Sequence, residues 1–169
     1  MKNEIVIHHS ASRKTTTVKD IELWHKLKDW GGGARAFKSD LGSYAQYHYI
    51  INDTGVHKIS NDWEHRWHCG LENSESIGIC VCGDYTIETI DYNTKLLLEE
   101  LLDRLCKEHN IPSNMVKGHK ECRGANTACP ASLMEFVKSY RGKDNLVKQL
   151  SLLQRAVILI KDLIKLKDD

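Results

Sequence analysis

The chain has 169 residues, a length that suits one domain with a substantial hydrophobic core and leaves little room for a second. Hydrophobic residues make up 41% of it and charged residues 28%, a balance typical of soluble globular proteins. The formal net charge is only +1, so the chain lacks the basic excess with which nucleic-acid-binding proteins follow a phosphate backbone.

The N-terminal residues carry charge at Lys2 and Glu4 and lead directly into a strand pattern. A secretory signal peptide needs a basic start followed by a longer apolar run, and a membrane-spanning helix needs roughly 18 apolar residues. We therefore expect a protein that is synthesised in the cytoplasm without a signal peptide and that has no transmembrane segment.

Residues 4–8 form a short β-branched run, which predicts a buried strand that delivers a histidine at its end. Thr17 and Asp20 have the spacing of a capping box at the start of a helix. Behind them one helical face collects four apolar side chains, and three glycines end the pattern. The apolar face consists of Val18, Ile21, Trp24 and Leu27, and the glycines are Gly31, Gly32 and Gly33.

Residues 46–52 and 55–60 are strand-like, and the Asn-Asp-Thr-Gly turn between them predicts a hairpin. Residues 61–75 are polar and aromatic without periodicity, which indicates a loop. The nearly continuous apolar run 76–82 is typical of a central strand that is covered on both faces. Cys80 and Cys82 lie in this run and are interpreted as small buried hydrophobes.

A strong helix follows, with Asn93 or Thr94 as its cap and Asn110 near its end. Its core stripe consists of Leu98, Leu101, Leu102 and Leu105. A short strand then leads to His119, and residues 130–140 are interpreted as a helix with proline at its start. Strands that alternate with helices predict an α/β fold with a mixed central β-sheet flanked by helices.

The pattern changes after Arg141, which divides the chain into a domain at 1–141 and a helical tail at 142–169. Two apolar stripes run side by side along an amphipathic helix, and the first has the 4-3 spacing of a heptad seam. The first stripe is Leu146, Leu150, Leu153, Val157, Ile160 and Ile164, and the second is Leu152, Ala156, Leu159, Leu163 and Leu166. Three arrangements would bury them: a homo-oligomer through residues 146–166, docking on the chain's own domain, or contact with a membrane surface.

Candidate metal ligands stand at two places in the chain. His8 and His9 end the first strand on opposite faces, although a single strand-end histidine is more often structural than a ligand. His119 and Cys129 lie ten residues apart, just ahead of a proline, and could form half of a zinc site, although this spacing alone is weakly specific. Tyr47 would by default be a packed aromatic.

Four sequence blocks occur in an order that resembles the peptidoglycan amidases shared by small phage lysins, bacterial type-2 amidases and animal peptidoglycan recognition proteins. The blocks are Ile5-Val-Ile-His-His-Ser-Ala11; Tyr47-His-Tyr-Ile-Ile51 with Gly55; His68 with Asn73-Ser-Glu-Ser-Ile-Gly-Ile79; and Gly118-His119 with Ala128-Cys-Pro130. They span roughly residues 4–140, so the resemblance covers the predicted domain and excludes the tail.

The resemblance implies a zinc amidase domain and a role for each matching residue. The zinc ligands would be His8, preferred over His9, with His119 and Cys129. Tyr47 would be the catalytic tyrosine, and Thr127 would stand where some phage members carry a catalytic lysine and animal amidases carry threonine. His68 and Asn73 would bind substrate in the groove.

Two imidazoles and one thiolate would leave Zn²⁺ with an open fourth position, which is the pattern of a catalytic site. Such an ion lowers the pKa of bound water toward ~7, and Tyr47 could stabilise the developing oxyanion. Cys122 could instead close the site as a fourth ligand, which would make it structural. Glu121 is a candidate base by proximity in sequence, although a solvated loop carboxylate is its simpler interpretation.

The expected activity is hydrolysis of the amide bond between N-acetylmuramic acid and L-alanine in peptidoglycan, by a phage or prophage lysin that reaches the cell wall after membrane permeabilisation. One alternative is a non-catalytic peptidoglycan-binding protein on the same fold. Cys129 favours the enzyme, since family members that only bind usually lack this ligand. An interaction protein on this fold has only the weak support of fold analogy.

Overall fold

In the computed structural model, the described residues are 1–143, 153–154 and 157. They form a five-stranded sheet with the order β3-β2-β4-β1-β5. Its strands are β1 (Glu4–His9), β2 (Tyr49–Asn52), β3 (Gly55–Lys58), β4 (Ser76–Val81) and β5 (Val116–Gly118). The β1–β4, β1–β5 and β2–β4 pairs are parallel, whereas the β2–β3 hairpin is antiparallel. The predicted mixed central sheet is therefore confirmed.

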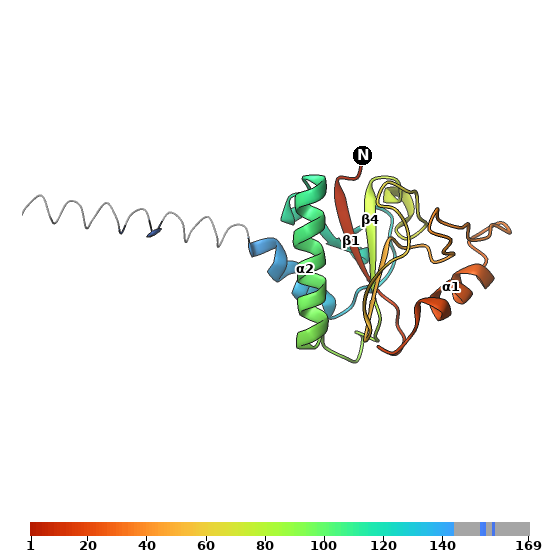
Figure 1. Cartoon of the computed structure of the whole chain (residues 1–169), viewed down its shortest axis with the longest axis horizontal. Coiled ribbons are helices and arrows are strands. Elements are labelled where there is room, and N and C mark those ends of the chain that lie inside the picture. The colour runs from red at the N-terminus through yellow and green to blue at the C-terminus, as the bar shows by residue number, and fades with distance from the viewer. Residues whose placement is uncertain (144–152, 155–156, 158–169) are drawn as a thin grey trace, which may run out of the picture.

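Helices cover both faces of the sheet (Figure 1). α2 (Tyr92–His109) and the helical residues 133–143 lie on one face, and α1 (Val18–Leu27) lies on the other. Three short 3-10 helices complete the described elements: η1 (Gly70–Glu72), η2 (Ser113–Met115) and η3 (His119–Glu121). The main core fills the α2 face and is built mostly from aliphatic side chains of the strands and helices. It includes Ile5, Ile7, Ile51, Ile77, Ile79, Leu98, Leu102, Leu105, Leu133 and Val137.

The helix caps agree with the sequence patterns in part. Thr17 and Asp20 form the predicted capping box of α1, and Asn110 ends α2 in the left-handed conformation. The cap of α2 is Asp91 rather than Asn93 or Thr94, because its carboxylate accepts the Thr94 N–H at 2.9 Å. The last described helix begins at residue 133 rather than at 130, since a turn containing a left-handed residue intervenes.

The apolar face predicted for α1 is buried only near its first turn. Ile21 is 2% exposed, whereas Trp24 and Leu27 are 46% and 67% exposed. Ile21 and Val18 pack against a small cluster on this side of the sheet, which includes Ala45 and Ile50. The second half of α1 does not reach that cluster, so the apolar face extends beyond the buried part of the helix.

Successive side chains of a strand point to opposite faces of the sheet, so His8 and His9 at the end of β1 face different sides. Ile5 and Ile7 belong to the core under α2, whereas Val6 packs against the loops on the opposite face. His8 therefore lies on the Val6 face, where it is 1% exposed. His9 lies on the other face, where its Nδ1 accepts the Tyr85 N–H at 3.2 Å. The alternation predicted for this pair is present.

His48 connects β2 to the loop over the sheet through two hydrogen bonds of its buried ring. Its Nδ1 accepts the Gly78 N–H at 2.9 Å, and its Nε2 donates to the Glu64 carbonyl at 2.9 Å. Burial, reinforced by nearby Lys2, lowers the pKa of His48 to about 3. Because the unfolded chain binds this proton at an ordinary pKa near ~6.5, stability is lost as the pH falls from that value toward the folded pKa.

Replacing His48 by glutamine is expected to flatten this part of the stability profile. Between pH ~6.5 and ~4.5 the wild-type protein should lose about 2–3 kcal/mol more unfolding free energy than His48→Gln. Urea unfolding at several pH values measures the difference. Parallel profiles for the two proteins would show that His48 titrates at its ordinary pKa.

Most of the predicted tail, including Leu146, Leu150, Ile160 and Ile164, lies outside the described residues. Leu153 and Val157 are described, and they are helical and 63% and 50% exposed. Across the described ranges, none of the helices combines the length and apolar composition that a bilayer span requires.

Truncation after Lys143 tests the three arrangements predicted for the tail. If residues 146–166 self-associate, the full chain should scatter light as a multimer and the truncated chain should be a soluble monomer. A monomeric full chain at high micromolar concentration would contradict self-association. An insoluble truncated chain would indicate docking on the chain's own domain, and binding of the full chain alone to anionic vesicles would indicate membrane contact.

Candidate metal centre

Three of the predicted ligands meet at one end of the sheet. His8 ends β1, and His119 follows β5, which pairs with β1 in parallel so that Ile7 lies opposite Gly118. The imidazole rings of His8 and His119 are 4.5 Å apart between centroids. The Cys129 sulfur joins them, and one donor atom from each residue lies within 4.8 Å of the others. Donors this close can share a single metal ion.

The protonation states of the three donor residues are compatible with zinc binding, provided that the cation displaces the thiol proton. Burial, with His119 as the next contribution, holds the pKa of His8 well below its usual value, and burial followed by Lys28 lowers the pKa of His119. Both imidazoles are therefore neutral and able to ligate. Burial raises the pKa of the Cys129 thiol to about 11, although the His9 N–H points at its sulfur from 3.4 Å. A cation at this point would stabilise the thiolate.

Hydrogen bonds specify the tautomer of His8. The Ser76 hydroxyl donates to the Glu72 carbonyl at 2.6 Å, so its oxygen accepts the Nε2–H of His68 at 3.3 Å. Burial keeps His68 neutral by lowering its pKa, so its Nδ1 carries a lone pair. That lone pair accepts the Nε2–H of His8 at 3.1 Å. The Nδ1 of His8 would then be free to bind a metal, and the hydrogen bond to His68 would hold the ring in that orientation.

Replacing His68 tests this outer-shell role. His68→Phe keeps a ring over Gly78 but cannot accept the His8 N–H, and we expect a loss of metal affinity of roughly 10–100-fold. His68→Gln can accept through its amide oxygen and should lose less. Chelator competition measures the affinity of each protein. Equal metal affinity in all three would show that His68 does not position His8.

Cys122 is not part of the three-residue donor group. Its side chain is 4% exposed and packs with Val6 and Cys69, and its thiol is hydrogen-bonded to that of Cys69. Among the described residues, the donor group contains only His8, His119 and Cys129. A metal ion held by these three donors would keep a fourth position for water or substrate, which is typical of catalytic zinc sites.

Tyr47 lies against the donor group. Its ring centroid is 5.1 Å from that of His8 and 5.2 Å from that of His25, and its hydroxyl is hydrogen-bonded to the Cys80 thiol. Burial of the hydroxyl raises the pKa of Tyr47 well above its usual value. The phenol therefore stays protonated and remains a hydrogen-bond donor over the whole physiological range.

Two further candidates have local partners. The Thr127 hydroxyl accepts the Cys129 N–H at 3.1 Å, which ties it to the backbone of the cysteine. The Glu121 carboxylate accepts the Gly118 N–H at 2.9 Å and pairs with Arg141 at 3.0 Å. Glu121 thus holds the loop after β5 and is a paired loop carboxylate rather than the solvated one expected as its simpler interpretation.

A cleft of about 430 Å³ opens beside His119. His68 and Asn73, the residues expected to bind substrate, both line it. The Asn73 side-chain oxygen also accepts the N–H groups of His68 and Cys69, at 2.9 and 2.8 Å, and so shapes the wall of the cleft.

Sequence reasoning did not identify the remaining wall of this cleft, which includes Lys28, Trp30 and Trp67. The Lys28 ammonium lies 4.2 Å from the Trp30 ring centroid. The signals available in the sequence were a tryptophan next to three glycines and the aromatic content of the loop 61–75. Neither signal shows that the two segments meet.

The fold and the site together define a class of protein: an α/β domain that gathers two histidines and a cysteine beside an aromatic cleft. The model of the N-acetylmuramoyl-L-alanine amidase family matches residues 2–132. The chain belongs to this family, which confirms the resemblance seen in the four sequence blocks.

Individual relatives agree with this membership. The amidase CwlH of Bacillus subtilis (strain 168) is 31% identical over 111 residues, which cover 62% of this chain and 42% of CwlH. The match therefore spans less than half the length of that relative. The structure of the endolysin amidase LysCS from Clostridium intestinale URNW has a TM-score of 0.65 at 25% identity and covers 82% of both chains. Drosophila PGRP-LB shares the fold, with a TM-score of 0.60 at 20% identity over 78% of this chain and 75% of PGRP-LB.

Proposed function

We propose that this protein is a zinc-dependent amidase that cleaves the bond between N-acetylmuramic acid and L-alanine in peptidoglycan. The observation that carries the proposal is the grouping of His8, His119 and Cys129 beside a cleft, in a member of the amidase family. Bound zinc would act as a Lewis acid and would activate water for attack on the amide carbon.

The residues around the ion would have separate roles in metal binding, transition-state stabilisation and substrate binding. His8 through Nδ1, His119 and Cys129 would hold zinc, and His68 would keep the His8 ring in place. Tyr47, a protonated donor next to His8, would turn its hydroxyl from the Cys80 thiol to the oxyanion that develops on the amide oxygen. Thr127 would fix the backbone before Cys129 and could assist proton transfer. The aromatic cleft, with His68 and Asn73 on its wall, would bind the muramoyl peptide.

We further propose that residues 1–141 form the amidase domain of a phage or prophage lysin that acts on the cell wall after membrane permeabilisation. Similarity to the structure of LysCS, an endolysin from Clostridium intestinale URNW, supports this role. The retained Cys129 favours catalysis over the rival function, a peptidoglycan-binding protein without activity.

Metal analysis and a wall-digestion assay separate these two functions. The purified protein should contain one zinc per chain and release new L-alanine amino termini from purified cell walls. Removal of the metal by a chelator should abolish release, and added zinc should restore it. Binding to walls with no new amino termini, in a zinc-loaded sample, would establish the non-catalytic alternative.

A further inference from the structure

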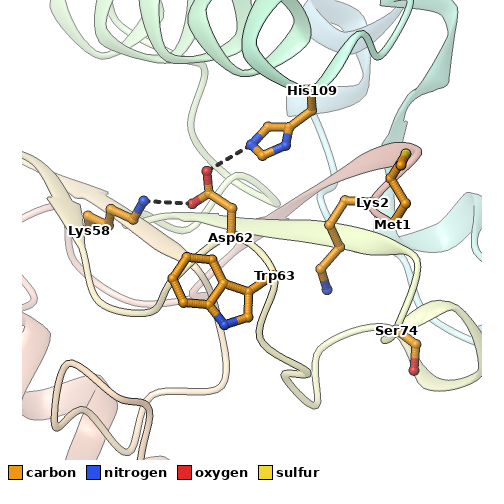
Figure 2. Close-up of a pocket in the computed structure, with 7 residues that line it drawn as sticks. All are labelled: Met1, Lys2, Lys58, Asp62, Trp63, Ser74 and His109. Atoms are coloured by element: carbon orange, nitrogen blue, oxygen red, sulfur yellow. Dashed lines mark hydrogen bonds and ion pairs between the residues drawn. The ribbon is translucent and has the colours of Figure 1, made fainter.

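A second cavity, of about 310 Å³, lies on the other side of the loop 61–75. Asn73 lines the cleft beside the metal centre, whereas the next residue, Ser74, lines this cavity. The other described lining residues are Met1, Lys2, Lys58, Asp62, Trp63 and His109. Figure 2 shows that they come from the segment before β1, the end of β3, the following loop and the end of α2. No lining residue is shared by the two depressions, so this cavity is separate from the cleft beside the metal centre.

Trp63 gives the cavity an exposed aromatic surface. Its side chain is 74% exposed, and within the described residues no aromatic ring or cation stacks on it. Hydrogen bonds nevertheless hold its loop in place: the Glu64 carboxylate accepts the Asn61 N–H at 2.7 Å, and the Glu64 carbonyl accepts from the Lys2 ammonium at 2.9 Å. The indole is therefore presented to solvent on a fixed backbone.

The charged groups of the cavity already have partners. Asp62 accepts from the Tyr49 hydroxyl at 2.7 Å, pairs with Lys58 at 2.9 Å and pairs with His109 at 2.8 Å. The buried Lys2 ammonium donates to backbone carbonyls rather than to a carboxylate. The Asp62 charge is thus compensated by Lys58 and the Lys2 ammonium is hydrogen-bonded, so the cavity offers donors and acceptors that suit a neutral polar ligand.

The same pairing argues against a second metal site. Asp62, Glu108 and His109 lie close enough to share an ion. Both Asp62 oxygens are already in hydrogen bonds, however, and Glu108 pairs with Arg104 at 2.9 Å. A cation would have to displace Lys58 and Arg104 from these carboxylates.

We propose that this cavity is an accessory binding site for a pyranose unit of the glycan strand, with Trp63 as its stacking platform. A pyranose ring combines an apolar C–H face, which packs on an indole, with a rim of hydroxyl and acetamido groups that need polar partners. An exposed tryptophan beside hydrogen-bonding side chains matches both needs. The inference rests on the proposed function, since it takes the polymer that the amidase cuts as the ligand.

Trp63→Ala in the full chain tests the site, with Tyr92→Ala as the matched control. Tyr92 is also 74% exposed but lies outside the cavity. Trp63→Ala should weaken cosedimentation with insoluble cell-wall sacculi about tenfold and raise KM on sacculi by a similar factor. The rate on a soluble muramoyl peptide and the melting temperature should stay unchanged. Trp63→Phe, which keeps an aromatic face, should retain most of the affinity, and Tyr92→Ala should match the wild type.

Three outcomes would overturn the inference. Equal sacculus binding by the wild type and Trp63→Ala would show that Trp63 does not contribute to recognition of the glycan strand. An equal loss on sacculi and on the soluble peptide would place its effect in the catalytic cleft. Loss of wild-type binding in ~0.5 M salt would show that charge, not stacking, drives recognition. If the wild type failed to cleave the soluble peptide, the proposed function would fail, and the sacculus-binding comparison would still decide this inference.

Discussion

Replacing Cys129 by serine should remove the metal and the activity together. Serine is a poor zinc ligand at neutral pH, because its hydroxyl resists the ionisation that a thiol undergoes on binding the ion. Loss of an outer-shell partner typically costs 10–100-fold in metal affinity, so loss of a ligand should cost more than about a hundredfold. Chelator competition and the release of L-alanine amino termini measure the two effects on the same samples.

Cys122→Ser is the matched control for this experiment. Cys122 is a buried thiol in the same segment that packs with Cys69 and is not part of the donor group. The variant should keep full zinc content and near-normal activity, at a modest cost in stability. If Cys122→Ser lost zinc and Cys129→Ser kept it, the ligand assignment would be wrong.

Replacing Tyr47 by phenylalanine should leave zinc bound and reduce kcat on the order of a hundredfold or more. A donor that is directed at a developing oxyanion is typically worth ~10²–10³ in kcat. The phenyl ring of the variant would still pack beside His8, so the metal ligands should keep their positions. The fall should appear in kcat rather than in KM, since the lost hydrogen bond forms only as charge develops.

Tyr44→Phe provides the comparison, because Tyr44 is another half-buried tyrosine of the same segment and contacts lysines rather than the donor group. It should retain wild-type kcat. Full activity in Tyr47→Phe, with zinc still bound, would show that Tyr47 is only a packed aromatic residue without a catalytic role.

The sequence predicted the parts of the site that local rules control. Strand alternation separated His8 from His9, and a capping box placed α1. The ordered motif blocks brought His119 and Cys129 into one hypothesis, and the structure places their donor atoms beside His8. These features depend on residue periodicity, or on motifs that are short enough to read along the chain.

The remaining features depend on contacts between distant segments. His68 accepts a hydrogen bond from His8, which lies 60 residues away in the sequence. No local pattern therefore indicates the series of hydrogen bonds from His8 through His68 to Ser76, which sets the tautomers of both rings. Arg66 is fully buried and donates to carbonyls such as that of Ala45 at 2.6 Å, although composition alone would place an arginine at the surface. The position of Arg66 depends on contacts between two loops that are distant in the sequence, and no local sequence pattern indicates such contacts.

The positions of the donors along the chain determine when metal binding becomes possible during synthesis. His8 leaves the ribosome before Cys129, so the donor group is complete only after Cys129 has emerged. A nascent chain, or a fragment cut anywhere between these points, carries an incomplete set of donors. On the proposed mechanism, interrupted translation, or proteolysis that separates His8 from Cys129, therefore yields fragments without hydrolytic activity.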